Sequence, residues 1–183
     1  MRKRRILVAL SVLVATPLLG AAGFALAGSM ATTTKTYVLK ATLRPSNETP
    51  PVKNAAGAAG VFSAKLTLSG SKGTLAWKLT FRNLTGPAFA AHVHLGSAGK
   101  AGKIAISLCG PCRTGAHGTT SLKASSAVAK AMLHRGAYAN VHTKKHPNGE
   151  IRGQIRVTGT TTKPVTGTSS TTAPTYTYTY SRP

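Results

Sequence analysis

Residues 88–95 read Ala-Phe-Ala-Ala-His-Val-His-Leu, and their side chains alternate between two kinds. Such a period of two is typical of a β-strand with one buried face, here formed by Phe89, Ala91, Val93 and Leu95. His92 and His94 then point together to the opposite face, with Cα atoms about 7 Å apart. The stretch therefore predicts a strand that buries its apolar side chains and presents two imidazoles on its other side.

The same alternation recurs in other segments, at residues 37–43, 62–68, 75–81 and 104–108, which are separated by Gly- and Pro-containing turns. Strands with one wet and one buried face form antiparallel sheets. We therefore expect an all-β fold, an antiparallel two-sheet, Greek-key-like sandwich of seven to eight strands. One short helix is expected near 126–134, with Ser126 as its cap and Gly136 just past its end.

The last hairpin is expected to join strands 140–143 and 150–157 through Pro147-Asn148-Gly149, a sequence typical of a three-residue bulged loop. This loop would pair His146 with Glu150, His142 with Gln154 and Val141 with Ile155. A two-residue turn would instead mix apolar and polar side chains on each face. The expected faces are an apolar one, with Val141, Ile151, Ile155 and Val157, and a polar one, with Asn140, His142, Glu150, Arg152 and Gln154.

Three histidines are candidate metal ligands. His92 and His94 share one strand face, and His142 on a neighbouring strand would complete a three-histidine site for Zn²⁺ or Cu²⁺. Glu150 or Glu48 would then hydrogen-bond the second ring nitrogen of a ligand. The alternative is a partly buried hydrogen-bond network that locks the strands together without a metal. His117, His134 and His146 lie in loop or helix-end contexts, as ordinary surface histidines do.

Acidic side chains are scarce. Glu48 and Glu150 are the only carboxylate side chains, against 24 Lys and Arg, so the net charge is +22. We expect Glu150 to pair with Arg152 or a neighbouring Arg, and Glu48 to accept hydrogen bonds near Pro50 and Pro51. Both belong to an expected structural polar network of Glu48, Asn140, Glu150, Arg152 and Gln154. The positive charge predicts anionic envelope polymers or polysaccharide as partners. No aromatic platform accompanies the basic residues, so specific nucleic-acid binding is not expected.

The termini differ from the centre in composition. Residues 1–27 are typical of a signal peptide, with four basic residues, an apolar stretch and Ala25-Leu26-Ala27; removing them leaves 20 Lys and Arg against two Glu, or +18. The alternative is an uncleaved membrane anchor. Residues 28–35 are a spacer, residues 36–157 one compact domain, and residues 158–183 a Thr/Ser/Pro-rich tail that is expected to be disordered. The protein is thus expected to be secreted or at the cell surface.

The two cysteines form the string Cys109-Gly110-Pro111-Cys112, which also occurs in thioredoxins. A redox motif needs a helix that begins at the first cysteine, and the residues from Arg113 onward are typical of a loop. A structural disulfide is therefore expected outside the cytoplasm. The chain has no Asp for a Ser-His-Asp triad, and an ion pair with Arg152 accounts for Glu150 more simply than a glycosidase carboxylate pair. No reaction is identified, and an enzyme is not the expected class.

Several blocks, in this order, resemble the CHRD domain, a module named after chordin and found singly in secreted bacterial proteins. They are Glu48-Thr-Pro-Pro51, Ala91-His-Val-His-Leu-Gly96, Gly99-Lys-Ala-Gly102, Tyr138-Ala-Asn-Val-His-Thr143 and Pro147-Asn-Gly-Glu-Ile-Arg-Gly-Gln154. The resemblance spans residues 37–157 and implies an all-β sandwich without a settled chemistry. The His-x-His strand is also similar to the copper strand of Cu/Zn superoxide dismutases, but the chain lacks an Asp for their zinc site.

Together these features predict a non-enzymatic binding or adhesion module at an anionic cell-envelope surface. The alternative is a copper- or zinc-binding protein that uses the His-x-His strand, with or without redox activity.

Overall fold

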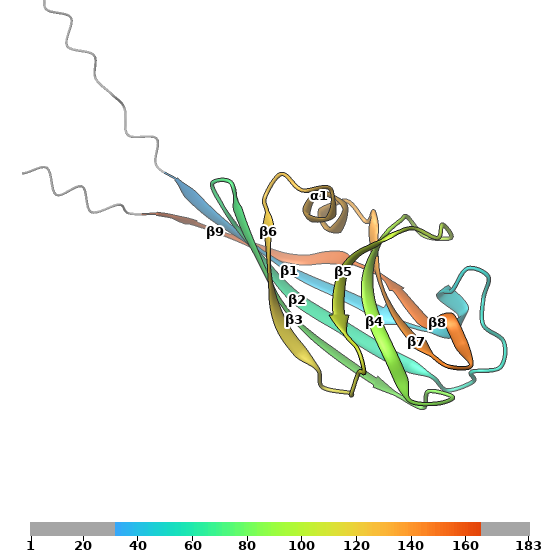
Figure 1. The fold of residues 1–183 in the computed structure, drawn as a ribbon. Coiled ribbons are helices and arrows are strands. Elements are labelled where there is room, and N and C mark those ends of the chain that lie inside the picture. The colour runs from blue at the N-terminus through green and yellow to red at the C-terminus, as the bar shows by residue number, and fades with distance from the viewer. Residues whose placement is uncertain (1–31, 166–183) are drawn as a thin grey trace, which may run out of the picture. The chain divides into compact units, whose positions relative to one another are not determined.

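The structure is a computed structural model that describes residues 32–165, and two antiparallel β-sheets make up most of it (Figure 1). The expected all-β sandwich is confirmed. Its elements are, in chain order, β1 Thr33–Leu43, η1 Pro45–Asn47, β2 Ala59–Ser69, β3 Lys72–Arg82, β4 Ala88–Leu95, β5 Ile104–Cys109, β6 His117–Lys123, α1 Ala127–Leu133, β7 Ala137–Thr143, β8 His146–Gln154 and β9 Arg156–Pro164.

One sheet has the strand order β6-β3-β2-β1-β9 and the other the order β5-β4-β7-β8. The chain crosses between the sheets at buried Ile155, which separates β8 from β9. Strand β6 was not among the strands predicted from sequence, because it is an edge strand whose residues 117–123 are exposed or half-buried and lack a buried apolar set.

The ordered strands extend beyond the predicted domain limits of 36 and 157. Thr33 at the start of β1 pairs with Pro164 at the end of β9, so part of the expected spacer and part of the expected tail belong to the five-stranded sheet. The expected signal peptide (1–27) and the rest of the tail, from residue 166, lie outside the described residues. No helix among residues 32–165 is long and apolar enough to cross a membrane.

The core lies between the two sheets, where alternate side chains of each strand meet. Leu39, Phe62 and Leu79 of the five-stranded sheet are fully buried, as are Val93 and Val141 of the other sheet. The helix confirms its predicted start, because Ser126 Oγ accepts a hydrogen bond from the Ala129 backbone N–H at 3.3 Å. Its Met132 is fully buried in the same core. The expected disulfide joins Cys109 and Cys112, whose Cα atoms are 5.2 Å apart.

The predicted register of the last hairpin is wrong. The turn consists of Lys144 and Lys145, so that Thr143 pairs with His146 and Val141 with Ile151. Between these two pairs β7 has one residue and β8 has four, residues 147–150, so Pro-Asn-Gly forms a bulge within β8 instead of the turn. The bulge lets the apolar pair reach the core despite the two-residue turn, and this possibility was missed.

Phe89 is a second correction. It was expected on the apolar face, but its side chain is 42% exposed and its ring centroid lies 6.0 Å from that of His142. The pairing of β4 with β7 is irregular between Ala88 and Ala90, and this irregularity interrupts the alternation.

The two faces of β1 provide a stability test. Leu39→Ala is expected to lower the free energy of unfolding by about 2–5 kcal/mol, because it empties a fully buried site. Val38→Ala, on the adjacent residue that is 41% exposed, is expected to change it by less than about 1 kcal/mol. Urea denaturation of both variants measures the difference, and equal losses would contradict the assignment of the faces.

Candidate metal centre

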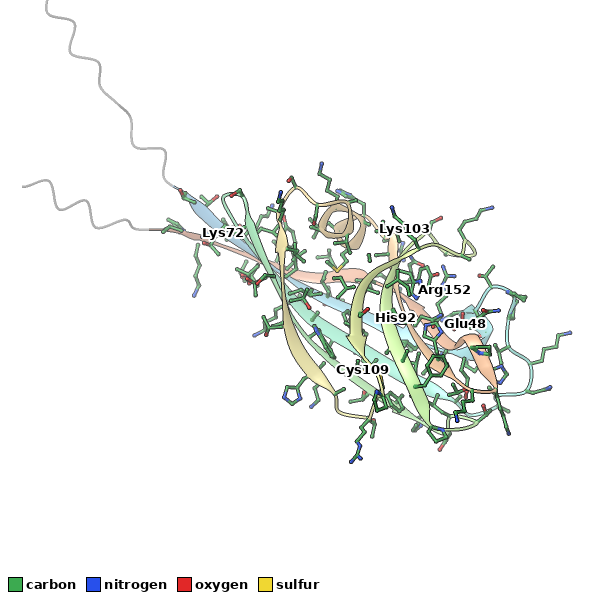
Figure 2. All side chains as sticks on the ribbon, in the orientation of Figure 1. Glu48, Lys72, His92, Lys103, Cys109 and Arg152 are labelled. Atoms are coloured by element: carbon green, nitrogen blue, oxygen red, sulfur yellow. A yellow bond between two sulfur atoms is a disulfide. The ribbon has the colours of Figure 1, made fainter. Side chains whose placement is uncertain are left out.

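The outer face of the four-stranded sheet carries the candidate site. On β4 and β7, His92 pairs with Asn140 and His94 with Tyr138, so these four side chains lie on one face. Because Val93 and Val141 occupy the intervening positions and face the core, the alternation that builds the core also delivers the imidazoles to the outside. Figure 2 shows His92, Glu48 and Arg152 in the same part of the molecule, away from Lys72.

His92, His94 and His142 converge. One ring nitrogen from each lies within 4.8 Å of the others, and His92 Nδ1 is 3.1 Å from His142 Nε2. In a tetrahedral zinc site with Zn–N bonds of about 2.1 Å, ligand nitrogens are roughly 3.4 Å apart. The His92–His142 pair therefore lies near the spacing of metal ligands, and the three nitrogens, within 4.8 Å of one another, converge on one point.

Backbone carbonyls set the tautomers of two rings. His94 Nδ1 lies 2.9 Å from the Gly102 carbonyl oxygen, and His142 Nδ1 lies 2.9 Å from the Pro147 carbonyl oxygen. A carbonyl oxygen only accepts hydrogen bonds, so each Nδ1 carries the proton and donates. The Nε2 of His94 is left with a lone pair for a metal, whereas the Nε2 lone pair of His142 accepts a hydrogen bond from His92 Nδ1, which a metal ion would replace. The expected carboxylate support from Glu48 or Glu150 is replaced by these carbonyls.

The rings favour the neutral state that metal ligation needs. Burial, together with the smaller effects of His142 and His94, lowers the pKa of His92 to about 4. Burial also lowers the pKa values of His94 and His142, against the opposing effect of their carbonyl hydrogen bonds. In addition, His94 Nε2 is buried without a hydrogen-bond partner in the described part of the chain. A buried nitrogen lone pair without a partner costs free energy, which an occupant of the site would recover.

Tyr138 and Arg152 hold the His94 side of the site. The His94 and Tyr138 rings are stacked, with centroids 4.9 Å apart, and the Arg152 guanidinium lies 3.4 Å from the Tyr138 centroid. Strand β7 lies between β4 and β8, so Tyr138 is flanked by His94 from one side and Arg152 from the other. The Tyr138 hydroxyl accepts a hydrogen bond from the Gly102 N–H at 3.1 Å. This stack was missed in the sequence because Tyr138 is remote from His94 along the chain.

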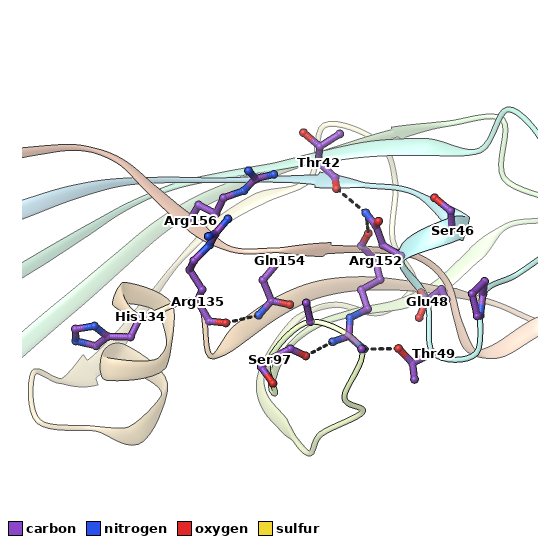
Figure 3. Close-up of a pocket in the computed structure, with 14 residues that line it drawn as sticks. Thr42, Ser46, Glu48, Thr49, Ser97, His134, Arg135, Arg152, Gln154 and Arg156 are labelled. Carbon is purple, nitrogen blue, oxygen red and sulfur yellow. Dashed lines mark hydrogen bonds between the residues drawn. The ribbon is translucent and has the colours of Figure 1, made fainter.

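Arg152 also holds two loops against the sheet through hydrogen bonds (Figure 3). Its Nη2 donates to the carbonyl oxygens of Ser97 and Lys100, both at 2.9 Å, and its Nη1 donates to Thr49 Oγ1 at 3.4 Å. The loop after β4 therefore has a fixed path, and the same loop supplies the Gly102 carbonyl to His94. Arg152 is only 2% exposed, and its interactions identify it as the anchor of the site.

Glu48 lies in this network as an outer support. Asn140 Nδ2 donates to Glu48 Oε1 at 3.0 Å and to Oε2 at 3.2 Å. Burial raises the pKa of Glu48 to about 7, against the opposing effects of Arg152, Asn140 and Thr49. Gly149 has a φ of +127°, and a Cβ there would lie 2.6 Å from Glu48 Oε1, so glycine is needed for this packing.

Glu150 is placed elsewhere, and its expected pairing with Arg152 is wrong. The fully buried carboxylate accepts hydrogen bonds from Thr85 N at 2.7 Å, from Thr85 Oγ1 at 2.8 Å and from Thr143 Oγ1. The bulge in β8 causes this, since it turns Glu150 to the side of Thr143. Of the predicted polar network, Glu48, Asn140, Arg152 and Gln154 do surround the outer face, and Gln154 Nε2 donates to the Gly96 carbonyl oxygen at 2.8 Å.

Comparison with known proteins identifies one family. The family model described as CHRD domain matches residues 39–155, which is more than half of the chain. No curated protein and no solved structure matches the chain.

The buried Glu48 predicts a pH-dependent stability difference. Its folded-state pKa of about 7 exceeds the ordinary 4.5, so the stability it contributes is full below pH 4.5 and is lost as the pH rises through 7. Relative to wild type, Glu48→Gln is therefore expected to become more stable by on the order of 2 kcal/mol between pH 5 and pH 8. Denaturant unfolding in a chelator measures this, and a difference that does not change with pH would contradict it.

Proposed function

This chain belongs to the CHRD domain family, and we propose that it is a binding module that holds one copper or zinc ion between His92, His94 and His142. The observation that carries the proposal is the convergence of three ring nitrogens within 4.8 Å of one another. Two of these nitrogens have lone pairs directed by backbone carbonyls, as in protein metal sites whose ligands are oriented by a second layer of hydrogen bonds.

The donor set favours particular ions. Three imidazoles suit Zn²⁺ or Cu²⁺, and the absence of a carboxylate or carbonyl ligand in the cluster disfavours Mg²⁺ and Ca²⁺. His94 and His142 are buried and His92 is half-buried, so the site is reached from the His92 side. Three protein ligands leave a fourth position for water or a small ligand.

The disulfide supports a location outside the cytoplasm. Cys109 and Cys112 are bonded, and disulfides persist in oxidising compartments. Together with the signal-like sequence of residues 1–27, this bond supports secretion or display at the cell surface.

Adhesion to an anionic envelope polymer is the second candidate function. Its specific support is the burial of both acidic side chains, since Glu48 is 7% exposed and Glu150 is 0% exposed. The chain has no other Asp or Glu, so the basic side chains of the surface have no acidic side chains among them. A surface of this kind attracts polyanions over a range set by the ionic strength.

Metal binding is tested on tag-free protein by elemental analysis and by titration with Cu²⁺ and Zn²⁺. One equivalent is expected to bind. His92→Ala, His94→Ala and His142→Ala are each expected to weaken binding by at least about tenfold, because changes to outer supports alone typically cost 10–100-fold.

His117→Ala is the matched control, because His117 is an exposed histidine at the end of edge strand β6. It is expected to leave the affinity unchanged. Wild-type protein that binds no stoichiometric metal, or a control that loses as much as the three site variants, would refute the metal proposal.

The second candidate function predicts steep salt dependence. Binding to soluble polyglycerol phosphate, followed by fluorescence anisotropy, is expected to weaken by about tenfold or more between roughly 50 and 300 mM NaCl, because salt screens exposed charges. Undetectable binding at the lower salt concentration, or an affinity independent of salt, would argue against an anionic envelope partner.

A further inference from the structure

A cleft of about 890 Å³ is lined in part by Arg152 and Glu48, two residues that also support the candidate metal centre (Figure 3). Its basic lining residues are His134, Arg135, Arg152 and Arg156, and its one acidic lining residue is the buried Glu48. Figure 3 shows Arg135 and Arg156 toward one end of the cleft and Glu48 toward the other. A volume of this size is typical of a site for a small ligand or a short polymer segment.

Arg135 and Arg156 are available to a ligand, unlike Arg152. Both side chains are exposed and make no hydrogen bond or ion pair within residues 32–165. The rest of the chain cannot supply an acidic side chain, because Glu48 and Glu150 are the only two and are bonded to Asn140, Thr85 and Thr143. No side-chain carboxylate of the chain therefore competes with an anionic ligand for the two guanidiniums.

The backbone holds Arg135 at the cleft. Its φ of +57° is left-handed, a conformation that glycine usually provides just after a helix. Gln154 Nε2 donates to the Arg135 carbonyl oxygen at 2.6 Å, which ties this residue to β8. A long basic side chain thus occupies a position where the backbone favours glycine, and it lines the cleft.

The remaining lining suits a polyhydroxylated ligand. Ser46, Asn47, Thr49 and Gln154 line the cleft with hydroxyl and amide groups, whereas none of its lining residues is Phe, Tyr or Trp. Asn47 donates through Nδ2 to the Arg152 carbonyl oxygen at 3.0 Å, which leaves its Oδ1 as an acceptor. The lack of an aromatic platform disfavours nucleobases, which bind single-strand sites by stacking.

We propose that this cleft binds an acidic polysaccharide, with one carboxylate, sulfate or phosphate group between Arg135 and Arg156 and sugar hydroxyls on the neighbouring amides. Guanidinium groups match such oxyanions through charge-assisted, bidentate hydrogen bonds. The inference rests on the second candidate function, adhesion to anionic polymers, and assigns it to a defined site instead of the whole basic surface.

The proposal is tested by measuring the binding of the full-length protein to three dextran oligomers of matched length. These are carboxymethyl dextran, dextran sulfate and neutral dextran. Wild type is expected to bind one or both acidic forms at about 50 mM NaCl, where charge is only partly screened, and not the neutral form. The relative affinity of the two acidic forms identifies the preferred oxyanion. The double variant R135Q/R156Q is expected to lose about tenfold in affinity or more, since two charge-assisted contacts are removed.

The matched control is R82Q/R113Q, which removes the same charge from two exposed arginines that do not line the cleft. It is expected to lose less than about threefold through the overall charge alone. Arg135→Gly provides a second check, because glycine fits the left-handed backbone and the melting temperature should hold while binding weakens.

The outcomes distinguish binding in the cleft from adhesion of the whole basic surface to anionic polymers. Equal losses in both double variants would overturn the cleft while leaving anionic adhesion in place. Absence of binding to either acidic dextran would overturn both. Zn²⁺ affinity is expected not to fall in R135Q/R156Q, which verifies that the neighbouring three-histidine cluster is intact.

Discussion

The antiparallel pairing of β4 with β7 is the constraint on which the rest of the structure depends. Its register places Val93 and Val141 in the core and, by the same alternation, places His92, His94 and His142 on the outer face. A slip by one residue would expose the apolar side chains and bury the imidazoles together. The free energy that stabilises the sandwich therefore also holds the backbone of the candidate metal ligands in place, and the loop after β4 adds the orientation of the His94 ring.

Local periodicity accounts for the part of this arrangement that could be predicted from sequence. The alternation within 88–95 assigned His92 and His94 to one face, and Ser126 marked the start of the helix. The last hairpin failed because Pro147-Asn148-Gly149 has the composition of a turn and lies instead in a bulge beside a two-lysine turn. Both arrangements bury Val141 and Ile151, so hydrophobic patterning alone does not separate them. The observed register also changes the partner of Glu150, because it places the Glu150 carboxylate beside Thr143.

The supporting contacts of the site were beyond prediction because they join residues far apart in the chain. Arg152 bonds to the Ser97 and Lys100 carbonyls, and the same loop orients His94 through the Gly102 carbonyl. The alternation of apolar and polar residues along a strand carries no information about such contacts. The one local signal is glycine: a Cβ at Gly102 would lie on top of the Leu95 carbonyl oxygen, so this position tolerates no side chain. Glycines close to a candidate ligand are therefore worth examining as sites where the backbone itself approaches a functional group.

The scarcity of acidic residues links the two proposed sites physically. A divalent ion between the histidines would enter a strongly positive molecule whose carboxylates, Glu48 and Glu150, are both buried and hydrogen-bonded. Like charges disfavour such an ion, and neutral imidazoles reduce this cost without cancelling it. An oxyanion held by Arg135 and Arg156 in the adjoining cleft would offset part of the repulsion. Under both proposals, this electrostatic effect makes metal and acidic polysaccharide each strengthen the binding of the other, and thermodynamic linkage requires the coupling free energy to be equal in the two directions.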